Sequence, residues 1–571
     1  MEKPWLAHYE EGTPAQIDVP HYPITQDLIE NARCHPDHPA LIYGSVVEPL
    51  GNLLLDREIS FRQLCDLTAR FAAGLQALGV KKGDRVVIHL PNCPQFVMAY
   101  YAILMIGAIA VPANPEYVAR ELKYQMNDSG AETIITLSLT YPTVKQIRAE
   151  TLLKRVIVTN VKEHFPRLLK FLFSTFKEKK EGHYQDISGD ADTLWLQDVL
   201  KSAQPHPAPV EINMGDTAVL MYTGGTTGTI KGAQLTHRNL QANAVQIRHW
   251  FPNLNEGEEM ILAALPFYHS YGMTTCMNLG IRTCTTNVLI VNPRVTAHSL
   301  KSIDKHGAGF YPGVPAFYIA IINHPNIDSY RLKSIKACIS GAAALPEKVQ
   351  QEFEFITGGR LVEGYGLSEA APVTHANPVF GERRNGTIGL PLPSTEAKIV
   401  DIETGLQELP PGETGEMILR GPQVMKGYWQ KPIETAYALR NGWLYTGDIA
   451  RMDKNGYFQI VDRKKDVIVG TSGYNIYPSE IEKVLRQHPK VKKCAIIGVP
   501  AGIEKGERVK AFIVLKENET VTEDEIKAFC HENLTPYKIP KFIEFRNELP
   551  VTPFGKVLRR VLLAEETSSR S

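Results

Sequence analysis

Apolar and polar positions alternate along the first part of the chain in a rhythm typical of an α/β domain. Segments with apolar residues every three or four positions, at 61–78 and 95–106, predict helices with one buried face. Short continuous apolar runs, at 85–90 and 108–112, predict strands buried on both faces. Similar runs recur at 133–137, 218–222, 260–265, 286–291 and 335–340. We therefore expect doubly wound, mostly parallel sheets that bind ligands at the carboxyl ends of their strands.

The pattern changes after about residue 390. Short strands with tight turns are predicted at 396–400, 415–420 and 457–460, which indicates a β-rich subdomain over about 391–462. Five consecutive charged residues at 462–466 interrupt the apolar pattern, and a stretch of mixed helices and strands follows them. We expect a large N-terminal domain over 1–462 and a small α+β C-terminal domain over 463–571.

One segment, 164–182, has the pattern of a basic amphipathic helix. Its predicted apolar face carries Phe165, Leu168, Leu169, Leu172, Phe173 and Phe176, and its polar face carries Arg167, Lys170, Ser174 and Lys177. Such a face either packs on its own domain or lies on an anionic membrane surface. The pattern alone leaves both alternatives open.

Composition excludes several classes of protein. The 571 residues contain 62 Lys+Arg and 62 Asp+Glu, so no net field favours nucleic acid, and bound anions must be met by local groups. The eight cysteines are scattered without a Cys-x-x-Cys motif, which predicts reduced, structural thiols. Apolar runs long enough to span a membrane are absent from the sequence. We expect a cytoplasmic protein, with peripheral contact at the inner membrane face as an option.

The strongest local motif is YTGGTTGTIKG at 222–232. It follows the apolar run 217–220 and precedes a helix-like stretch at 236–247, so we expect a turn from strand to helix. Glycines let backbone N–H groups approach phosphates, threonine hydroxyls donate hydrogen bonds, and Lys231 supplies positive charge. The lysine lacks the neighbours of a Walker A loop. The motif therefore predicts a polyphosphate site of another kind.

Together with this motif, four others resemble the adenylate-forming superfamily, which includes acyl-CoA synthetases. They are EGYGLSE at 363–369, YTGD at 445–448, DRKKDVI at 462–468 and LPVTPFGK at 549–556. The resemblance covers nearly the whole chain. It implies a large AMP-binding domain, a small mobile C-terminal domain, and the use of ATP, Mg²⁺ and coenzyme A.

The resemblance also implies roles for individual residues. Lys556, Glu369 and Lys231 correspond to catalytic residues, Thr226 and Glu369 to magnesium ligands, and Lys465 to the hinge. Gly473 and Tyr474 belong to a segment that replaces the Lys556 loop when the thiol attacks. The remaining positions correspond to nucleotide contacts: Thr223, Gly224, Gly225, Thr226, Thr227, Gly228, Gly341, Ala342, Gly364, Tyr365, Gly366, Ser368, Asp448 and Arg463.

The same comparison implies an acyl pocket. His269 stands where amino-acid-activating members carry Asp, which disfavours an amino acid substrate, and Tyr311, Gly313 and Ser340 are the other predicted pocket residues. We expect a long-chain fatty acid in view of the similarity to bacterial long-chain synthetases. The alternatives are a medium-chain or aryl (4-coumarate-like) acid, a fatty acyl-AMP ligase that loads a carrier protein, and a non-catalytic homologue. A homodimer is expected only because two-fold dimers are common.

Overall fold

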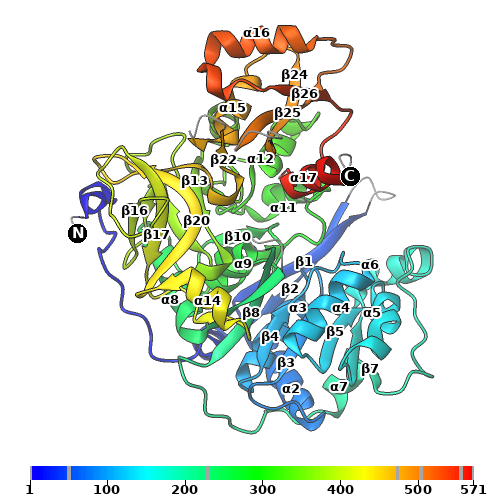
Figure 1. The fold of residues 1–571 in the computed structure, drawn as a ribbon. Coiled ribbons are helices and arrows are strands. Elements are labelled where there is room, and N and C mark those ends of the chain that lie inside the picture. The colour runs from blue at the N-terminus through cyan, green and yellow to red at the C-terminus, as the bar shows by residue number, and fades with distance from the viewer. Residues whose placement is uncertain are drawn as a thin grey trace. The chain divides into compact units, whose positions relative to one another are not determined.

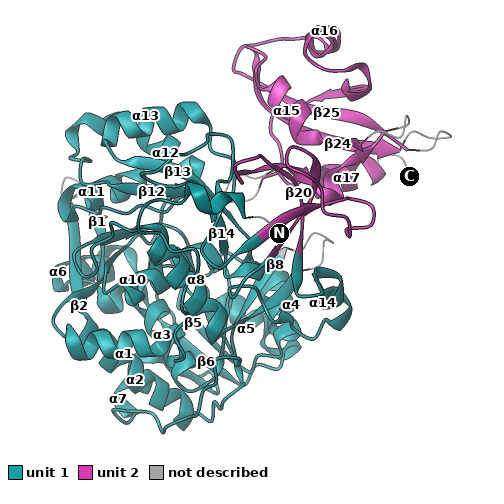
Figure 2. Cartoon of the chain, turned by 90° about the vertical axis from the view of Figure 1, so that its left-hand side faces the viewer, with its two compact units in different colours: residues 1–225, 230–396, 420–444 teal, residues 226–229, 397–419, 445–571 magenta. Residues whose placement is uncertain are grey.

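The computed structural model describes residues 3–47, 53–224, 230–470, 475–500, 506–551 and 557–568. It divides into two compact units (Figure 2), of which the first comprises 1–225, 230–396 and 420–444, and the second 226–229, 397–419 and 445–571. Most of the predicted β-rich subdomain thus clusters with the C-terminal segment, because its strands pair with one another in one sheet. The predicted division at residue 462 stays a prediction.

The first unit contains an eight-stranded sheet in the order β18-β9-β8-β4-β3-β5-β6-β7. Figure 1 labels its strands β8, β4, β3, β5 and β7. From β8 to β7 all neighbours are parallel, whereas β9 and β18 add an antiparallel edge. The central strands are buried on both faces, which confirms the interpretation of the continuous apolar runs. The strands are β3 (Arg85–His89), β4 (Ile109–Pro112), β5 (Thr133–Leu137), β6 (Arg155–Thr159), β7 (Thr193–Trp195), β8 (Thr217–Gly224), β9 (Ile230–Thr236) and β18 (Gly427–Tyr428).

Two four-stranded groups, β10-β11-β1-β2 and β12-β13-β14-β15, form the second sheet region of this unit. Phe310 bridges Ile261 and Ala337, so backbone pairing continues from one group to the other. The strands are β1 (Pro39–Val47), β2 (Leu53–Ser60), β10 (Met260–Ala263), β11 (Thr286–Leu289), β12 (Ala337–Ser340), β13 (Arg360–Gly366), β14 (Val373–Ala376) and β15 (Leu390–Pro391). The mixed α/β class expected from the sequence is confirmed.

Helices accompany both sheets. The predicted helices at 61–78 and 95–106 are confirmed as α2 (Phe61–Ala77) and α3 (Pro94–Met105). The longer of the other helices are α1 (Thr25–Cys34), α4 (Ala119–Ser129), α5 (Tyr141–Ile147), α7 (Leu196–Ser202), α8 (His237–Trp250), α11 (Thr296–His306), α12 (Pro315–Ile322), α13 (Glu347–Thr357) and α14 (Pro432–Ala438). Among the described helices, none combines the length and the apolar character that crossing a membrane requires.

The amphipathic segment differs from its prediction. It forms α6 (Arg167–Leu172) followed by a π-helical turn, η5 (Phe173–Lys177), so the spacing of its side chains does not keep one α-helical period. Phe165, Leu169 and Phe173 are buried, whereas Leu168, Phe171 and Phe176 are 52%, 64% and 66% exposed. The single apolar face predicted from the sequence is therefore split between the domain core and the surface.

Three sheets have strands in the second unit. One has the order β16-β17-β20-β19, with β21 paired to β20, although β19 belongs by its residue numbers to the first unit. The other two have the orders β24-β25-β26 and β22-β23, where β22 is Ile468–Val469 and β23 is Asn475–Ile476. Helices α15 (Pro478–Leu485), α16 (Glu523–Asn533) and α17 (Arg559–Ser568) belong to the C-terminal part. Ile481, Ile496 and Ile513 lie in a buried core there. The strands are β16 (Glu396–Val400), β17 (Thr414–Arg420), β19 (Leu439–Arg440), β20 (Trp443–Met452), β21 (Phe458–Arg463), β24 (Val491–Pro500), β25 (Glu507–Leu515) and β26 (Phe542–Phe545).

Candidate active site

The Gly- and Thr-rich motif joins two antiparallel strands. Thr223 pairs with Lys231 and Gly224 with Ile230, so β8 and β9 form a hairpin whose connection is 225–229. The expected turn from strand to helix is therefore wrong, since helix α8 begins only after β9. The sequence misled because 230–236 is short and mixed in polarity, which is typical of an edge strand as well as of a helix start. Lys231 consequently projects from a strand.

Lys231 lies in a buried position beside an aromatic ring. Its side chain is 6% exposed, and its ammonium nitrogen lies over the Tyr428 ring, 5.1 Å from the centroid. A desolvated cation over a tyrosine face is stabilised by the ring quadrupole. The Tyr428 hydroxyl in turn donates a hydrogen bond to Glu369 Oε1 at 2.8 Å. Two residues predicted to be catalytic, Lys231 and Glu369, thus contact the same side chain.

Glu369 stands in a 3-10 turn, Ser368–Ala370, that several segments hold in place. The Met425 amide donates to the Glu369 carbonyl oxygen at 2.8 Å, and the Ser368 and Ser270 hydroxyls lie 3.0 Å apart. Thr274, from the π-helical turn η6 (Met273–Asn278), donates to the Ala371 carbonyl oxygen at 2.7 Å. These hydrogen bonds fix the backbone that carries the Glu369 carboxylate.

Tyr365 is the penultimate residue of the preceding strand, β13, and is half-buried. Its ring lies 6.0 Å from the buried His375 ring on the neighbouring strand β14. Gly366, which follows it, has no space for a side chain, because an added Cβ would lie 2.2 Å from the Pro372 carbonyl oxygen. The two strands therefore approach closely at the end that carries Tyr365. Gly364 lies on the same strand, and Gly341 and Ala342 directly follow strand β12.

The predicted pocket residues divide into an accessible and an inaccessible set. His269 is exposed to solvent, yet the surrounding protein desolvates the imidazole enough to lower its pKa to about 4. At neutral pH this imidazole is therefore uncharged. Tyr311, Gly313 and Ser340 are buried, with Tyr311 packed 5.4 Å from the Tyr318 ring. Only His269 of this set reaches accessible space.

In the second unit, Asp448 and Arg463 form an ion pair. They lie directly opposite each other on the antiparallel strands β20 and β21, and Arg463 Nε is 2.7 Å from Asp448 Oδ1. Asp448 is 2% exposed, and its amide donates to Thr446 Oγ1 at 3.1 Å. The sequence reasoning anticipated a role for both residues but not their pairing.

The predicted hinge residue, Lys465, lies in the turn Lys464–Asp466. Its two neighbours are anchored by ion pairs. Lys464 lies 2.7 Å from Glu416, and Asp466 lies 3.0 Å from Arg559, which also pairs with Glu482 at 2.7 Å. Burial and these carboxylates act in opposite directions on Arg559, and the carboxylates prevail and raise its pKa. The backbone on either side of Lys465 is thus tied within the second unit.

Seven predicted site residues lie outside the described residues: Gly225, Thr226, Thr227, Gly228, Gly473, Tyr474 and Lys556. Their roles stay predictions. Val551 and Val557, which flank the Lys556 segment, pair with each other through a β-bridge.

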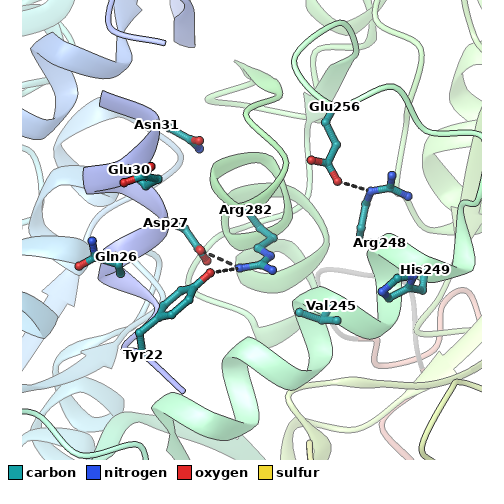
Figure 3. A pocket seen from close by; sticks show the side chains of 10 residues that line it. All are labelled: Tyr22, Gln26, Asp27, Glu30, Asn31, Val245, Arg248, His249, Glu256 and Arg282. Carbon is teal, nitrogen blue, oxygen red and sulfur yellow. Dashed lines mark hydrogen bonds and ion pairs between the residues drawn. The ribbon is translucent and has the colours of Figure 1, made fainter. Parts of the chain in front are cut away.

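A cavity in the first unit is lined by none of the predicted site residues (Figure 3). Its volume is about 560 Å³, and its lining comes from α1, α8, α10 (Leu279–Arg282) and neighbouring loops. Both of its arginines are already paired, Arg282 with Asp27 at 2.8 Å and Arg248 with Glu256 at 2.6 Å. Both arginine charges are therefore offset by carboxylates of the same cavity, and we assign the cavity no part in catalysis.

The donor set around Glu369 fits magnesium. Within the described part of the chain, no group of three or more His, Cys, Asp or Glu side chains could hold a metal. Magnesium does not require such a cage, because it keeps several waters and binds through one or two carboxylates plus substrate phosphates. Glu369 supplies one carboxylate, and Tyr428 and Ser368 beside it carry only oxygen donors.

Two family models match this chain. The model described as AMP-binding enzyme matches residues 28–429, and the model of the AMP-binding enzyme C-terminal domain matches residues 480–556. Because the first match alone covers more than half of the sequence, the chain belongs to the AMP-binding enzyme family. The adenylate-forming resemblance of the five motifs is thereby confirmed.

Curated relatives are similar over their full length. A long-chain-fatty-acid–CoA ligase of Bacillus subtilis (strain 168) is 43% identical over 572 residues, which cover 100% of this chain and 99% of the relative. One from Haemophilus influenzae is 37% identical over 581 residues, with 100% of both chains covered. Among solved structures, ATP-bound MatB from Rhodopseudomonas palustris has a TM-score of 0.80 at 27% identity, covering 96% of this chain and 99% of that one.

Proposed function

We propose that this chain activates a long-chain fatty acid with ATP and transfers the acyl group to coenzyme A, giving acyl-CoA, AMP and pyrophosphate. The observation that carries the proposal is the 43% identity to the Bacillus subtilis long-chain-fatty-acid–CoA ligase over both whole chains. The match spans the stretches of this chain that hold the five motifs, which supports a catalytic ligase over a non-catalytic binding module.

In the first half-reaction a carboxylate oxygen attacks the α-phosphorus of ATP. A new O–P bond forms, the bond to the β-phosphate oxygen breaks, and pyrophosphate leaves with the electron pair. The reaction brings anions together, so its main requirement is positive charge held in the right place. Lys231 supplies one such charge for the departing phosphates, and Lys556 is proposed to supply a second at the reacting oxygens. Magnesium held by Glu369, when bound, offsets further phosphate charge.

In the second half-reaction the thiol of coenzyme A loses its proton and attacks the acyl carbon. A C–S bond forms, and the C–O bond to AMP breaks, with AMP taking the electron pair. By resemblance, Gly473 and Tyr474 serve this step after the small domain turns about Lys465. Asp448 and Arg463 are proposed to hold the ribose and phosphate in both steps, and Tyr365 to stack on adenine.

The acyl chain is proposed to enter beside His269. An uncharged imidazole in an accessible, desolvated position tolerates an alkyl chain, whereas it offers no anion to an amino group. Tyr311, Gly313 and Ser340 lie in buried positions, so their participation requires movement of the neighbouring side chains. This supports a fatty acid over an amino acid and does not separate chain lengths.

We also propose that the segment 164–182 contacts an anionic membrane surface. Leu168, Phe171 and Phe176 are exposed, while Phe165 anchors the segment by stacking on Tyr43 at 5.3 Å. Arg167, Lys179 and Lys180 are exposed in the same segment. Exposed aromatic side chains beside cations favour the boundary between lipid headgroups and acyl chains.

A homodimer is also proposed, only because two-fold dimers are the commonest oligomers. Light scattering of the purified protein gives the molecular mass that tests it.

The function is tested by release of AMP and pyrophosphate from ATP in the presence of coenzyme A. The panel of acids is acetate, octanoate, palmitate, oleate and 4-coumarate, and each reaction is repeated without coenzyme A. We expect the highest kcat/KM with palmitate or oleate and formation of their thioesters. Turnover confined to octanoate or 4-coumarate would assign another acid class. Acyl-AMP without thioester, even with coenzyme A present, would indicate a ligase that loads a carrier protein.

A further inference from the structure

Tyr428 is held against both charged groups of the ATP site by strand pairing. Strand β18 places Tyr428 opposite Ala233 on β9. Ala233 and Lys231 are two residues apart on that strand, so their side chains share one face of the sheet. A residue opposite Ala233 is the diagonal neighbour of Lys231, at a distance that an aromatic ring can span. The 5.1 Å separation between the Lys231 ammonium and the Tyr428 ring follows from this register.

The hydroxyl end of Tyr428 has a different partner from the ring. It donates to Glu369 Oε1 at 2.8 Å. A carboxylate that accepts this bond is restrained in its rotation. The ring and the hydroxyl therefore hold a cation and an anion at two ends of one rigid side chain.

We propose that Tyr428 is a positioning residue that keeps the magnesium-binding carboxylate of Glu369 apart from the phosphate-binding ammonium of Lys231. The inference rests on the proposed ATP-dependent function. If the hydroxyl is removed, Glu369 is free to turn toward the nearby positive charge of Lys231. Each group then neutralises the other instead of meeting the metal and the phosphates. Tyr428 thus prepares the site before the nucleotide binds.

The sharpest test is Tyr428→Phe, which keeps the ring over Lys231 and removes only the donor to Glu369. Binding of Mn²⁺·ATP is measured by electron paramagnetic resonance and by calorimetry, beside binding of ATP without metal. A hydrogen bond to a charged group is lost, so we expect Mn²⁺·ATP to bind about tenfold more weakly. Metal-free ATP should also bind more weakly, because the Lys231 ammonium then meets the Glu369 carboxylate instead of the phosphates.

Tyr141→Phe is the matched control, because the Tyr141 hydroxyl also donates to a carboxylate, Asp190, at 2.7 Å. It should leave metal–nucleotide binding unchanged. A double-mutant cycle with Glu369→Gln separates positioning from general loss of structure, since the effect of Tyr428→Phe should vanish once the carboxylate is gone. Thermal unfolding of each variant is measured first. Should Tyr428→Phe not fold, Tyr428→Trp, which keeps a ring and an N–H donor, takes its place and should lose less affinity than Tyr428→Leu.

Two results overturn the inference. One is Mn²⁺·ATP affinity in Tyr428→Phe equal to that of Tyr141→Phe, and the other is an equal loss in the presence and absence of Glu369. Failure of the proposed function gives a different result, because the unmodified protein would then release no pyrophosphate with any acid. The comparison of Mn²⁺·ATP binding between the variants would still test the role of Tyr428.

Discussion

Asp448 and Arg463 face each other across β20 and β21, and the guanidinium Nε lies 2.7 Å from the Asp448 carboxylate. The carboxylate is 2% exposed, so its charge is offset by Arg463 and not by bulk water. The Asp448–Arg463 pair is therefore charge-balanced within the second unit. A ribose that hydrogen-bonds to Asp448 would meet an acceptor whose orientation is already set.

Asp448→Asn should weaken both folding and nucleotide binding. The substitution removes the negative charge that faces the Arg463 guanidinium, so we expect a loss of about 1–3 kcal/mol in the free energy of unfolding. It also removes an acceptor proposed for the ribose, so KM for ATP should rise about tenfold or more. Urea denaturation and initial rates measure the two effects. Asp304→Asn breaks an exposed pair with Arg331 and should cost below about 1 kcal/mol. Equal effects of the two variants would contradict the proposed role.

The stability of the fold should fall as the pH decreases from about 6.5, partly through His375. Burial lowers the pKa of His375 to about 3 in the folded state. The unfolded histidine titrates near 6.5, so between these values the unfolded state binds more protons and is favoured by acid. The free energy of unfolding is therefore unaffected by this titration above about pH 6.5. Below that pH it decreases by up to about 1.4 kcal/mol per pH unit.

His375→Gln should make the free energy of unfolding less dependent on pH between about pH 5 and 6.5, by the amount that corresponds to about one bound proton. Denaturant unfolding at several pH values measures this slope. His21→Gln, at an exposed position, is the control and should keep the original slope. An unchanged slope in His375→Gln would show that this imidazole is protonated in the folded protein.

Lys556→Ala should separate the two half-reactions. By resemblance Lys556 bridges the substrate carboxylate and the α-phosphate, so its loss should lower acid-dependent release of pyrophosphate by about a hundredfold or more. Thioester formation from supplied acyl-AMP should stay within about threefold, because that step is assigned to the segment with Gly473. Rapid-quench assays of each half-reaction make the comparison. Loss of both activities together would contradict this division of roles.

Phe171→Ser combined with Phe176→Ser should reduce binding to vesicles that contain phosphatidylglycerol. Each exposed phenyl ring that enters lipid contributes at most about 2 kcal/mol, so partial insertion of two predicts a loss of tenfold or more in the partition coefficient. Co-sedimentation at low salt measures it. Phe355→Ser, at a side chain 87% exposed on α13, is the matched control and should bind as the unmodified protein does. Equal binding of all three proteins would exclude this surface as the contact.

Local pattern was sufficient for most of the secondary structure. The apolar run at 133–137 and the short strand predicted at 396–400 became β5 and β16 with the predicted bounds, because a short segment bounded by turns leaves few alternatives to a strand. The stretch 230–236 was misinterpreted, since pairing with β8 decides its conformation and that pairing is not encoded in local periodicity. For the segment 164–177 the helical character was predicted, but the single apolar face was not found, because a π-helical turn shifts the side chains.

By itself, the sequence determined the family and the order of the elements, and it predicted Lys231, Glu369, Asp448 and Arg463 as site residues. Motif composition carries that information, since each chemistry restricts the residue types it can use. The tertiary structure alone decided which of these groups touch. Tyr428 lies 59 residues from Glu369 and meets it only because β18 pairs with β9, and the partners of Asp448 and Lys231 likewise come from neighbouring strands. Long-range strand pairing depends on the packing of the whole unit, so no local pattern contains it.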